Sequence, residues 1–122
     1  MKTYHMKKID TTHIKPEDLP KLEKVVNALS KKGFGVKLAG SATQRPDYQD
    51  IDLGCWINKN YDENDHRQED IRDALKQVKA EHVRWKDNMV FSTVYTARIE
   101  FKITGTYFDL MYSPSGRYLG YK

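Results

Sequence analysis

The segment Asp50-Ile51-Asp52-Leu53-Gly54-Cys55-Trp56-Ile57 carries the clearest structural pattern in this sequence. Every second residue from Ile51 onward is apolar, which is typical of a β-strand that buries one face. The opposite face then carries Asp50, Asp52, Gly54 and Trp56. The alternation predicts a strand over residues 50–57 with two carboxylates on its polar side.

Two amphipathic helices are predicted on either side of this strand. Before it, Leu22, Val25, Val26 and Leu29 recur at helical spacing, which predicts a helix over residues 17–32, and Gly33 is placed to cap its end. After it, a second stripe predicts a helix over residues 66–81; its members are Ile71, Ala74, Leu75 and Val78.

The remaining segments favour strands. We expect a short strand over residues 35–39, a hinge around residues 86–88, and a hairpin of two strands over residues 93–104 and 106–112. This order of elements predicts a single α+β domain (an α/β two-layer arrangement) over residues 1–122, with a mixed β-sheet and helices packed on one face.

Composition agrees with one soluble domain. The chain has 122 residues, a net charge of +4, and hydrophobic and charged fractions of 39% and 31%. It has no apolar run of the roughly 20 residues that span a membrane, and residues 1–13 do not have the pattern of a signal peptide. The single cysteine, Cys55, excludes an internal disulfide and favours a buried thiol in a reducing, cytoplasmic environment.

Asp50 and Asp52 are the strongest chemical signal. Residues two apart on a strand point to the same side, with Cα atoms about 6.5–7 Å apart. Two carboxylates without a basic residue between them repel each other, and divalent cations such as Mg²⁺ prefer carboxylate oxygens. The alternative for an isolated Asp-X-Asp pair is an ordinary solvent-exposed face.

The predicted hairpin supplies a third carboxylate. A two-residue turn at Gly105-Thr106 would pair Ile103 with Phe108 and Lys102 with Asp109. Asp109 would then lie on the polar side of the sheet. Lys102 would form a cross-strand ion pair with it, or contact a triphosphate in the same site.

These residues resemble a known signature. Leu38-Ala39-Gly40-Ser41, an eight-residue spacer and Asp50-Ile51-Asp52-Leu53 are similar to the motif of the DNA polymerase β-like nucleotidyltransferase superfamily. Asp109 is placed like the third carboxylate of that family. The resemblance extends over residues 17–112 and implies a nucleotidyltransferase fold.

The resemblance also implies an activity and a cofactor. It implies transfer of a nucleoside monophosphate from an NTP to an acceptor hydroxyl, with Asp50, Asp52 and Asp109 as catalytic residues that bind Mg²⁺ or Mn²⁺. Gly40 and Ser41 would contact the triphosphate. The acceptor stays open among nucleic acid, protein and small molecule.

The spacer loop departs from the family pattern. Small members commonly carry Arg-Gly in this loop and Ser before the first Asp, whereas this chain has Arg45-Pro46 and Gln49 there. Arg45 is still expected to reach a phosphate. Trp56, on the same side as the carboxylates, would either stack on a base or pack under the loop of the second helix.

Two other functions fit the same sequence. A chain of this size resembles the antitoxin-like half of a two-protein system, in which the fold binds a partner protein. A homo-oligomer or a partner would also complete an acceptor site. Alternatively, the aromatic and basic tail over residues 113–122 would make the chain a non-catalytic nucleic-acid-binding module.

Overall fold

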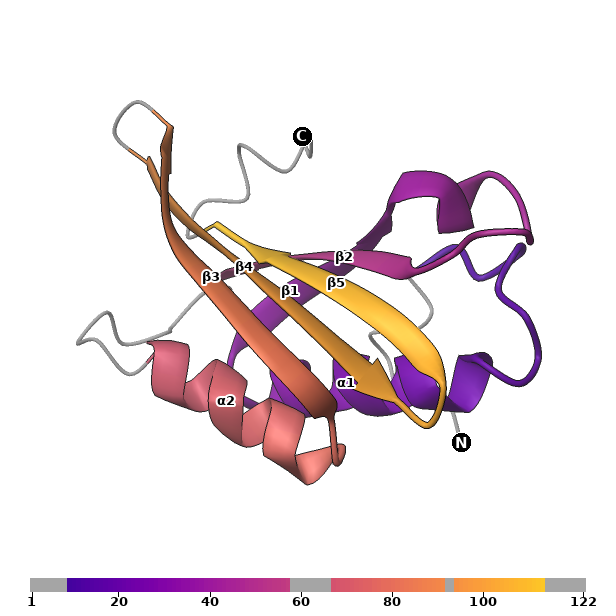
Figure 1. Ribbon diagram of the computed structural model, residues 1–122, viewed down its shortest axis with the longest axis horizontal. Coiled ribbons are helices and arrows are strands. Elements are labelled where there is room, and N and C mark those ends of the chain that lie inside the picture. The colour runs from indigo at the N-terminus through magenta and orange to yellow at the C-terminus, as the bar shows by residue number, and fades with distance from the viewer. Residues whose placement is uncertain (1–8, 58–66, 92–93, 114–122) are drawn as a thin grey trace.

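The structure is a computed structural model that describes residues 9–57, 67–91 and 94–113. It has a five-stranded mixed sheet of order β1-β2-β5-β4-β3, with both helices on one face (Figure 1). The predicted α+β class is confirmed. In chain order the elements are α1 (Leu19–Lys31), β1 (Phe34–Ala39), the short 3₁₀ helix η2 (Gly40–Thr43), β2 (Ile51–Ile57), α2 (Arg67–Gln77), β3 (Glu81–Phe91), β4 (Val94–Ile103) and β5 (Thr106–Tyr112).

Strands β2 and β5 form the parallel pair of the sheet, and the other pairings are antiparallel. β5 follows β4 through a hairpin and then inserts beside β2, so the end of the described chain lies in the middle of the sheet. Their register places Asp52 directly beside Asp109. The parallel pairing therefore joins two acidic residues that are far apart in the sequence.

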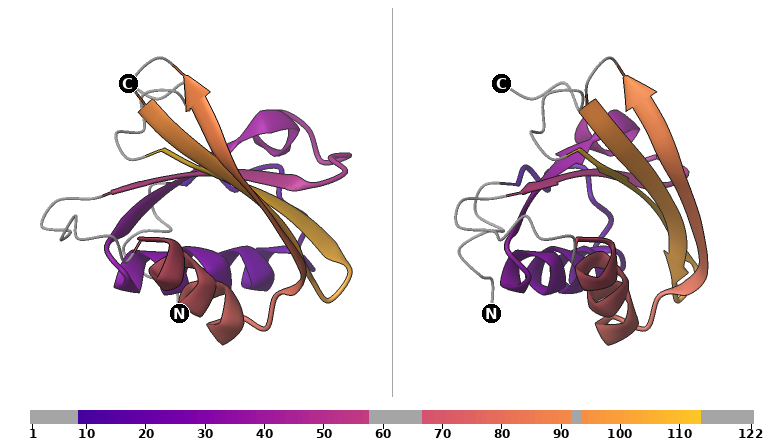
Figure 2. Two further views of the ribbon diagram at one scale, coloured as in Figure 1. Left: turned by 60° about the vertical axis from the view of Figure 1, so that its left-hand side comes forward. Right: turned by 90° about the vertical axis from the view of Figure 1, so that its left-hand side faces the viewer.

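The core lies between the helices and the sheet. Figure 2 shows α1 and α2 next to each other below the sheet, and the residues of their apolar stripes are buried. The predicted alternation of β2 is confirmed, since Ile51, Leu53 and Cys55 are fully or almost fully buried. Cys55 is a buried thiol, and burial raises its pKa well above the usual value. The other fully buried large side chains are Leu22, Val25, Val26, Leu29, Phe34, Ile71, Ile99, Phe108 and Leu110.

The second helix and the hinge differ from prediction. α2 ends at Gln77, and Lys79 adopts a left-handed backbone with φ of 58° that redirects the chain into β3. Residues 86–88 are not a hinge between elements, because they lie inside β3, although the pairing register shifts between Lys86 and Met89. The apolar alternation of β3 is weak because it is the outermost strand, and its Val83 is 41% exposed.

The predicted hairpin register is wrong by two residues. The turn consists of Thr104 and Gly105, both with positive φ (41° and 87°), as two-residue turns that match strand twist require. Lys102 consequently pairs with Tyr107 instead of Asp109. Because side chains alternate with a period of two, this shift leaves every residue on its predicted face. Asp109 stays on the polar side, with Glu100 opposite it.

None of the helices in the described part of the chain is long and apolar enough to cross a membrane. The N-terminal residues 1–8 and most of the basic tail, residues 114–122, lie outside the described residues.

Candidate metal centre

Three carboxylates meet on the face of the sheet that the helices leave uncovered. One oxygen each from Asp50, Asp52 and Asp109 lies within 4.8 Å of the others, and all three residues are half-buried. Asp52 and Asp109 are partners in the β2–β5 ladder, and Asp50 lies just before β2. The structure thus gathers the three residues that the sequence singles out; their metal-binding and catalytic roles stay predictions.

The electrostatics of this cluster favour a cation. The pKa of Asp52 is raised from 3.8 to about 6, chiefly by burial and then by the charges of Asp50 and Asp109, while Arg98 opposes the shift. Negative charge is therefore held close together at neutral pH with incomplete compensation. Carboxylate oxygens at this spacing are suitable ligands for Mg²⁺ or Mn²⁺.

Arg98 on β4 is part of this cluster, and the sequence interpretation missed it. Its Nε donates to both oxygens of Asp109, at 3.0 and 2.9 Å, and its Nη2 donates to Oδ2. These bonds raise the pKa of Arg98. In the observed register Arg98 pairs with Met111, so it lies diagonal to Asp109, within reach of a long side chain. Only the correct hairpin register would have identified this contact.

Gly40 lies directly against Asp52. Its φ is +70°, and a Cβ atom built there would be 2.1 Å from Asp52 Oδ2. The close approach follows from the β1–β2 ladder, in which Ala39 pairs with Asp52 and Gly40 comes next. Glycine is required at this position for its backbone angle and for the lack of a side chain.

The other predicted nucleotide contacts lie around this point. Ser41 follows Gly40 in η2, and its carbonyl accepts hydrogen bonds from the amides of Gln44 and Arg45 at 2.9 and 3.0 Å. The Arg45 side chain is exposed and pairs with Asp47 in its own loop at 3.3 Å. Lys102 Nζ lies 5.2 Å from the ring centre of Tyr107, away from Asp109.

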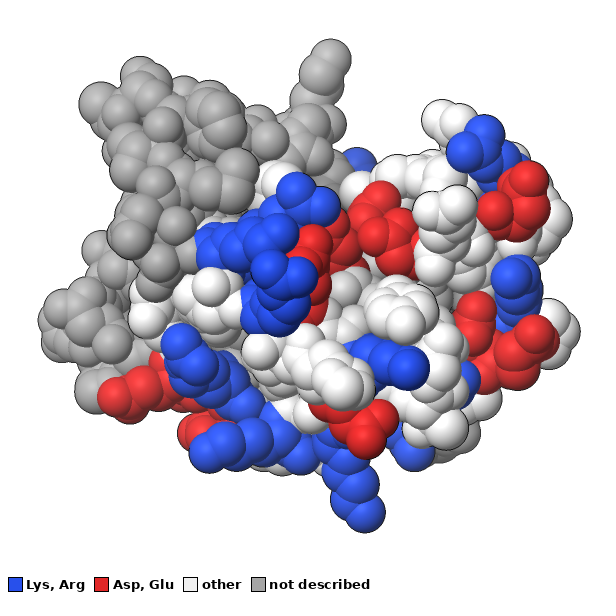
Figure 3. All heavy atoms as spheres, viewed as in Figure 1, with Lys and Arg blue, Asp and Glu red and all other residues white. Residues whose placement is uncertain are grey.

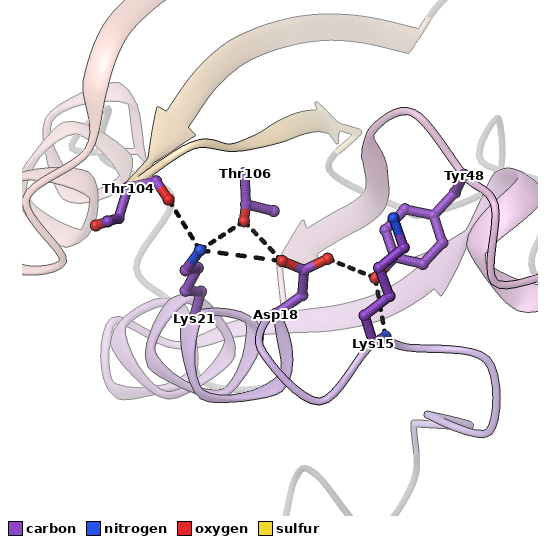
Figure 4. Close-up of polar contacts among 6 residues, drawn as sticks. All are labelled: Lys15, Asp18, Lys21, Tyr48, Thr104 and Thr106. Atoms are coloured by element: carbon purple, nitrogen blue, oxygen red, sulfur yellow. Dashed lines mark hydrogen bonds and ion pairs between the residues drawn. The ribbon is translucent and has the colours of Figure 1, made fainter.

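A buried polar network anchors the loop that carries Asp50 (Figure 4). Tyr48 Oη donates to Asp18 Oδ2 at 2.6 Å and accepts from the Lys15 amide at 3.0 Å. Thr106 Oγ1 donates to the other Asp18 oxygen at 2.7 Å. Burial, and then Asp18, raise the pKa of Tyr48 to about 12.

This network joins three elements next to the carboxylates. Asp18 precedes α1, Thr106 begins β5, and Lys21 Nζ donates to Thr106 Oγ1 at 2.8 Å and to the Thr104 carbonyl at 2.9 Å. Asp50 lies between Tyr48, which the network holds, and Ile51, which is fully buried. Asp18 stands just before Leu19, where a residue commonly caps a helix, but the Asp18 side chain makes no capping hydrogen bond. Sequence spacing gave no signal for this tertiary role.

Trp56 packs against its cross-strand partner. Trp56 pairs with Gly35, and a Cβ atom on Gly35 would be 2.3 Å from the indole ring. The loop of the second helix, under which packing of Trp56 is predicted, lies outside the described residues, and base stacking also stays a prediction.

Comparisons with known proteins include a distant structural likeness. No protein-family model matches the sequence, and no curated protein matches it. A chain of the solved GLD-2/RNP-8 complex superimposes with a TM-score of 0.45 at 19% sequence identity. The match covers 80% of this chain and 39% of that chain, so this chain spans well under half of that chain's length.

Proposed function

We propose that this chain is a metal-dependent nucleotidyltransferase that moves a nucleoside monophosphate from an NTP to an acceptor hydroxyl. The observation that supports this most directly is the meeting of Asp50, Asp52 and Asp109 within 4.8 Å on an uncovered sheet face. A nucleotidyltransferase needs such a set of oxygen ligands, together with a route for the phosphates. Gly40 beside Asp52 offers that route.

The three carboxylates would hold Mg²⁺ or Mn²⁺. Their oxygens are of the ligand type that these ions prefer, and the charge repulsion on Asp52 would be relieved by a cation. When bound, such ions stabilise negative charge on a reacting phosphate and lower the pKa of a nearby hydroxyl.

The triphosphate would approach along Gly40 and Ser41. Gly40 is exposed and has no side chain, so phosphate oxygens can come close to the backbone amides there. The Ser41 hydroxyl would add a hydrogen bond. Arg45, which is 64% exposed, would exchange its contact with Asp47 for a phosphate.

The acceptor would approach from the side of Asp109. Its oxygen would form a bond to the α-phosphorus while the bond from that phosphorus to the β-phosphate oxygen breaks, and pyrophosphate leaves. The hydroxyl proton would pass to the Asp109 carboxylate. Arg98 fixes the orientation of that carboxylate through its two Nε contacts.

Isothermal titration with ATP, GTP, CTP and UTP tests this function. Each nucleotide is titrated with Mg²⁺ and with EDTA into the wild type, Asp50→Ala and Asp73→Ala. Asp73 is an exposed carboxylate on α2 and serves as the control. We expect binding that requires Mg²⁺, is lost in Asp50→Ala and persists in Asp73→Ala. Failure of every nucleotide to bind under both conditions would contradict the proposal.

A further inference from the structure

A groove leads away from the carboxylates across the uncovered face of the sheet. It has a volume of about 490 Å³, begins at Asp50, passes Tyr107 and Lys102, and reaches Arg84 on β3. β3 is one of the two edge strands of the sheet. The groove therefore joins the candidate metal centre to an open edge.

The side chains along this groove suit bases and phosphates. Tyr107 is 55% exposed, which is unusual for a large aromatic residue, and Lys102 lies beside its ring. Arg84 is exposed, and no carboxylate among the described residues forms an ion pair with it. An exposed ring beside a cation is an arrangement that stacks on a nucleobase and binds an adjoining phosphate.

The surrounding surface carries positive charge. The polar side of β3 and β4 presents four cations, with Glu81 paired with Lys102 and Glu100 paired with Arg84 in the strand register; the cations are Arg84, Lys86, Arg98 and Lys102. Lys86 and Arg98 lie 3.4 and 3.9 Å from Glu100. Figure 3 shows basic side chains gathered over β3 and β4 next to acidic side chains over β2 and β5. This charge favours a polyanion.

The position of the groove identifies which substrate it fits. In the sheet order β1-β2-β5-β4-β3, Gly40 lies on one side of the carboxylates and the groove lies on the other. The NTP phosphates would take the Gly40 side, which leaves the groove for the acceptor. A chain with its end at the carboxylates would follow the groove toward the edge strand β3.

We propose that the acceptor is a single-stranded nucleic acid that lies in this groove. Its terminal hydroxyl end lies near Asp50 and Asp109, a base stacks on Tyr107, and Arg84 and Lys102 contact phosphates. The assignment of the strand as acceptor rests on the proposed nucleotidyl transfer. Binding of the strand does not, because these contacts are made by the protein alone.

Fluorescence anisotropy with a labelled twelve-nucleotide oligo(U) tests the proposal. The full chain is titrated in EDTA at several KCl concentrations, as the wild type, Tyr107→Ala and the double variant Arg84→Ala/Lys102→Ala. The control is Lys24→Ala/Lys31→Ala, which removes the same charge from a cavity on the helical side. Circular dichroism confirms that each variant is folded.

We expect a specific loss in the groove variants. The double variant should bind about tenfold more weakly, with a salt dependence of log K reduced by about 1.4, since each phosphate contact on a single strand contributes about 0.7. Tyr107→Ala should bind about tenfold more weakly because one stacked base is lost. The control should bind as the wild type does. Equal losses in the control and the groove double variant, or wild-type binding by the double variant, would overturn the proposal.

Two further measurements separate this proposal from the proposed function. UMP should not displace the oligonucleotide at the same nucleotide concentration; displacement would show a mononucleotide site and overturn a strand acceptor. NTP binding in Mg²⁺ and oligonucleotide binding in EDTA are then compared in the wild type. If the wild type binds NTP but no oligonucleotide, strand binding in the groove is disproved and the proposed transferase function is not. If it binds the oligonucleotide but no NTP, the transferase function is disproved and strand binding in the groove stands.

Discussion

At the scale of single residues, Asp52 is held at a cost to stability. Its folded pKa of about 6 exceeds the ordinary value of 3.8, so the folded state binds its proton more tightly. This tighter proton binding adds to the free energy of unfolding below pH 4. The added stability is lost as the pH rises through 6. Asp52→Asn should therefore stabilise the metal-free protein at pH 7.5, by on the order of 1 kcal/mol because the site is partly solvated.

Urea unfolding in EDTA measures this effect at pH 7.5 and pH 4, with Asp73→Asn as the control. The gain should shrink toward zero at pH 4, where Asp52 is already largely protonated. A larger gain at pH 4 than at pH 7.5 would show that burial of the ionised Asp52 carboxylate, together with repulsion from Asp50 and Asp109, is not its cause.

Gly40 allows a matched comparison with Gly105. Both have positive φ, but a Cβ atom at Gly40 would collide with Asp52, whereas at Gly105 it would meet nothing within 4 Å. Either alanine variant should lose about 1–3 kcal/mol of stability from its backbone angle. Only Gly40→Ala should also displace Asp52 and weaken Mn²⁺ binding, measured by electron paramagnetic resonance. Equal Mn²⁺ affinities in the two variants would rule out the contact as a determinant of the site.

The residues of the site differ in how far the sequence reveals them. Asp50, Asp52 and Asp109 are found because strand alternation alone places them on a polar face. Arg98 lies on the same face, but its bond to Asp109 depends on pairing between two strands, which local pattern does not specify. Asp18 and Tyr48 are 30 positions apart, and their contact arises only from tertiary packing.

At the scale of elements, the loop before β2 depends on its anchor to α1. Tyr48→Phe removes the hydrogen bond to Asp18 and leaves that buried carboxylate with one fewer donor. We expect a loss of about 1–3 kcal/mol in stability. Because Asp50 is two residues from Tyr48, we also expect weaker Mn²⁺ binding by the folded protein at low temperature.

The exposed Tyr107 provides the control for this variant, as Tyr107→Phe. It should retain both stability and Mn²⁺ affinity. If Tyr48→Phe were less stable yet bound Mn²⁺ as the wild type does, the network would serve folding alone and would not position Asp50.

The hairpin shows which part of an element is readable from sequence. The apolar alternation of β4 and β5 fixes their faces, and these were predicted correctly. The turn fixes the register, and Thr104-Gly105 was used in place of Gly105-Thr106 because Thr104 accepts a positive φ of 41°. Strand β3 was missed because an edge strand needs little apolar alternation, and its first residue, Glu81, was included in the second helix.

At the scale of the whole molecule, metal binding should stabilise the fold. The carboxylates come together only in the folded chain, so a cation that binds them shifts the folding equilibrium. At an ion concentration 100 times the dissociation constant, the gain should be about 2.7 kcal/mol. Calorimetry in Mg²⁺ and in EDTA should show a higher melting temperature in Mg²⁺ for the wild type and no difference for Asp50→Ala. The same shift in both proteins would place the ion elsewhere.

The parallel pairing of β2 with β5 has a consequence for the order in which the molecule is made. Residue Asp109 reaches Asp52 only after the segment that follows β2 has folded back across the sheet. Contacts of such long sequence separation form late and slowly during folding. A chain that is still growing on the ribosome and has not reached residue 109 contains Asp50 and Asp52 but lacks the third carboxylate. Whatever chemistry needs all three carboxylates is therefore absent from nascent chains that have not yet reached residue 109.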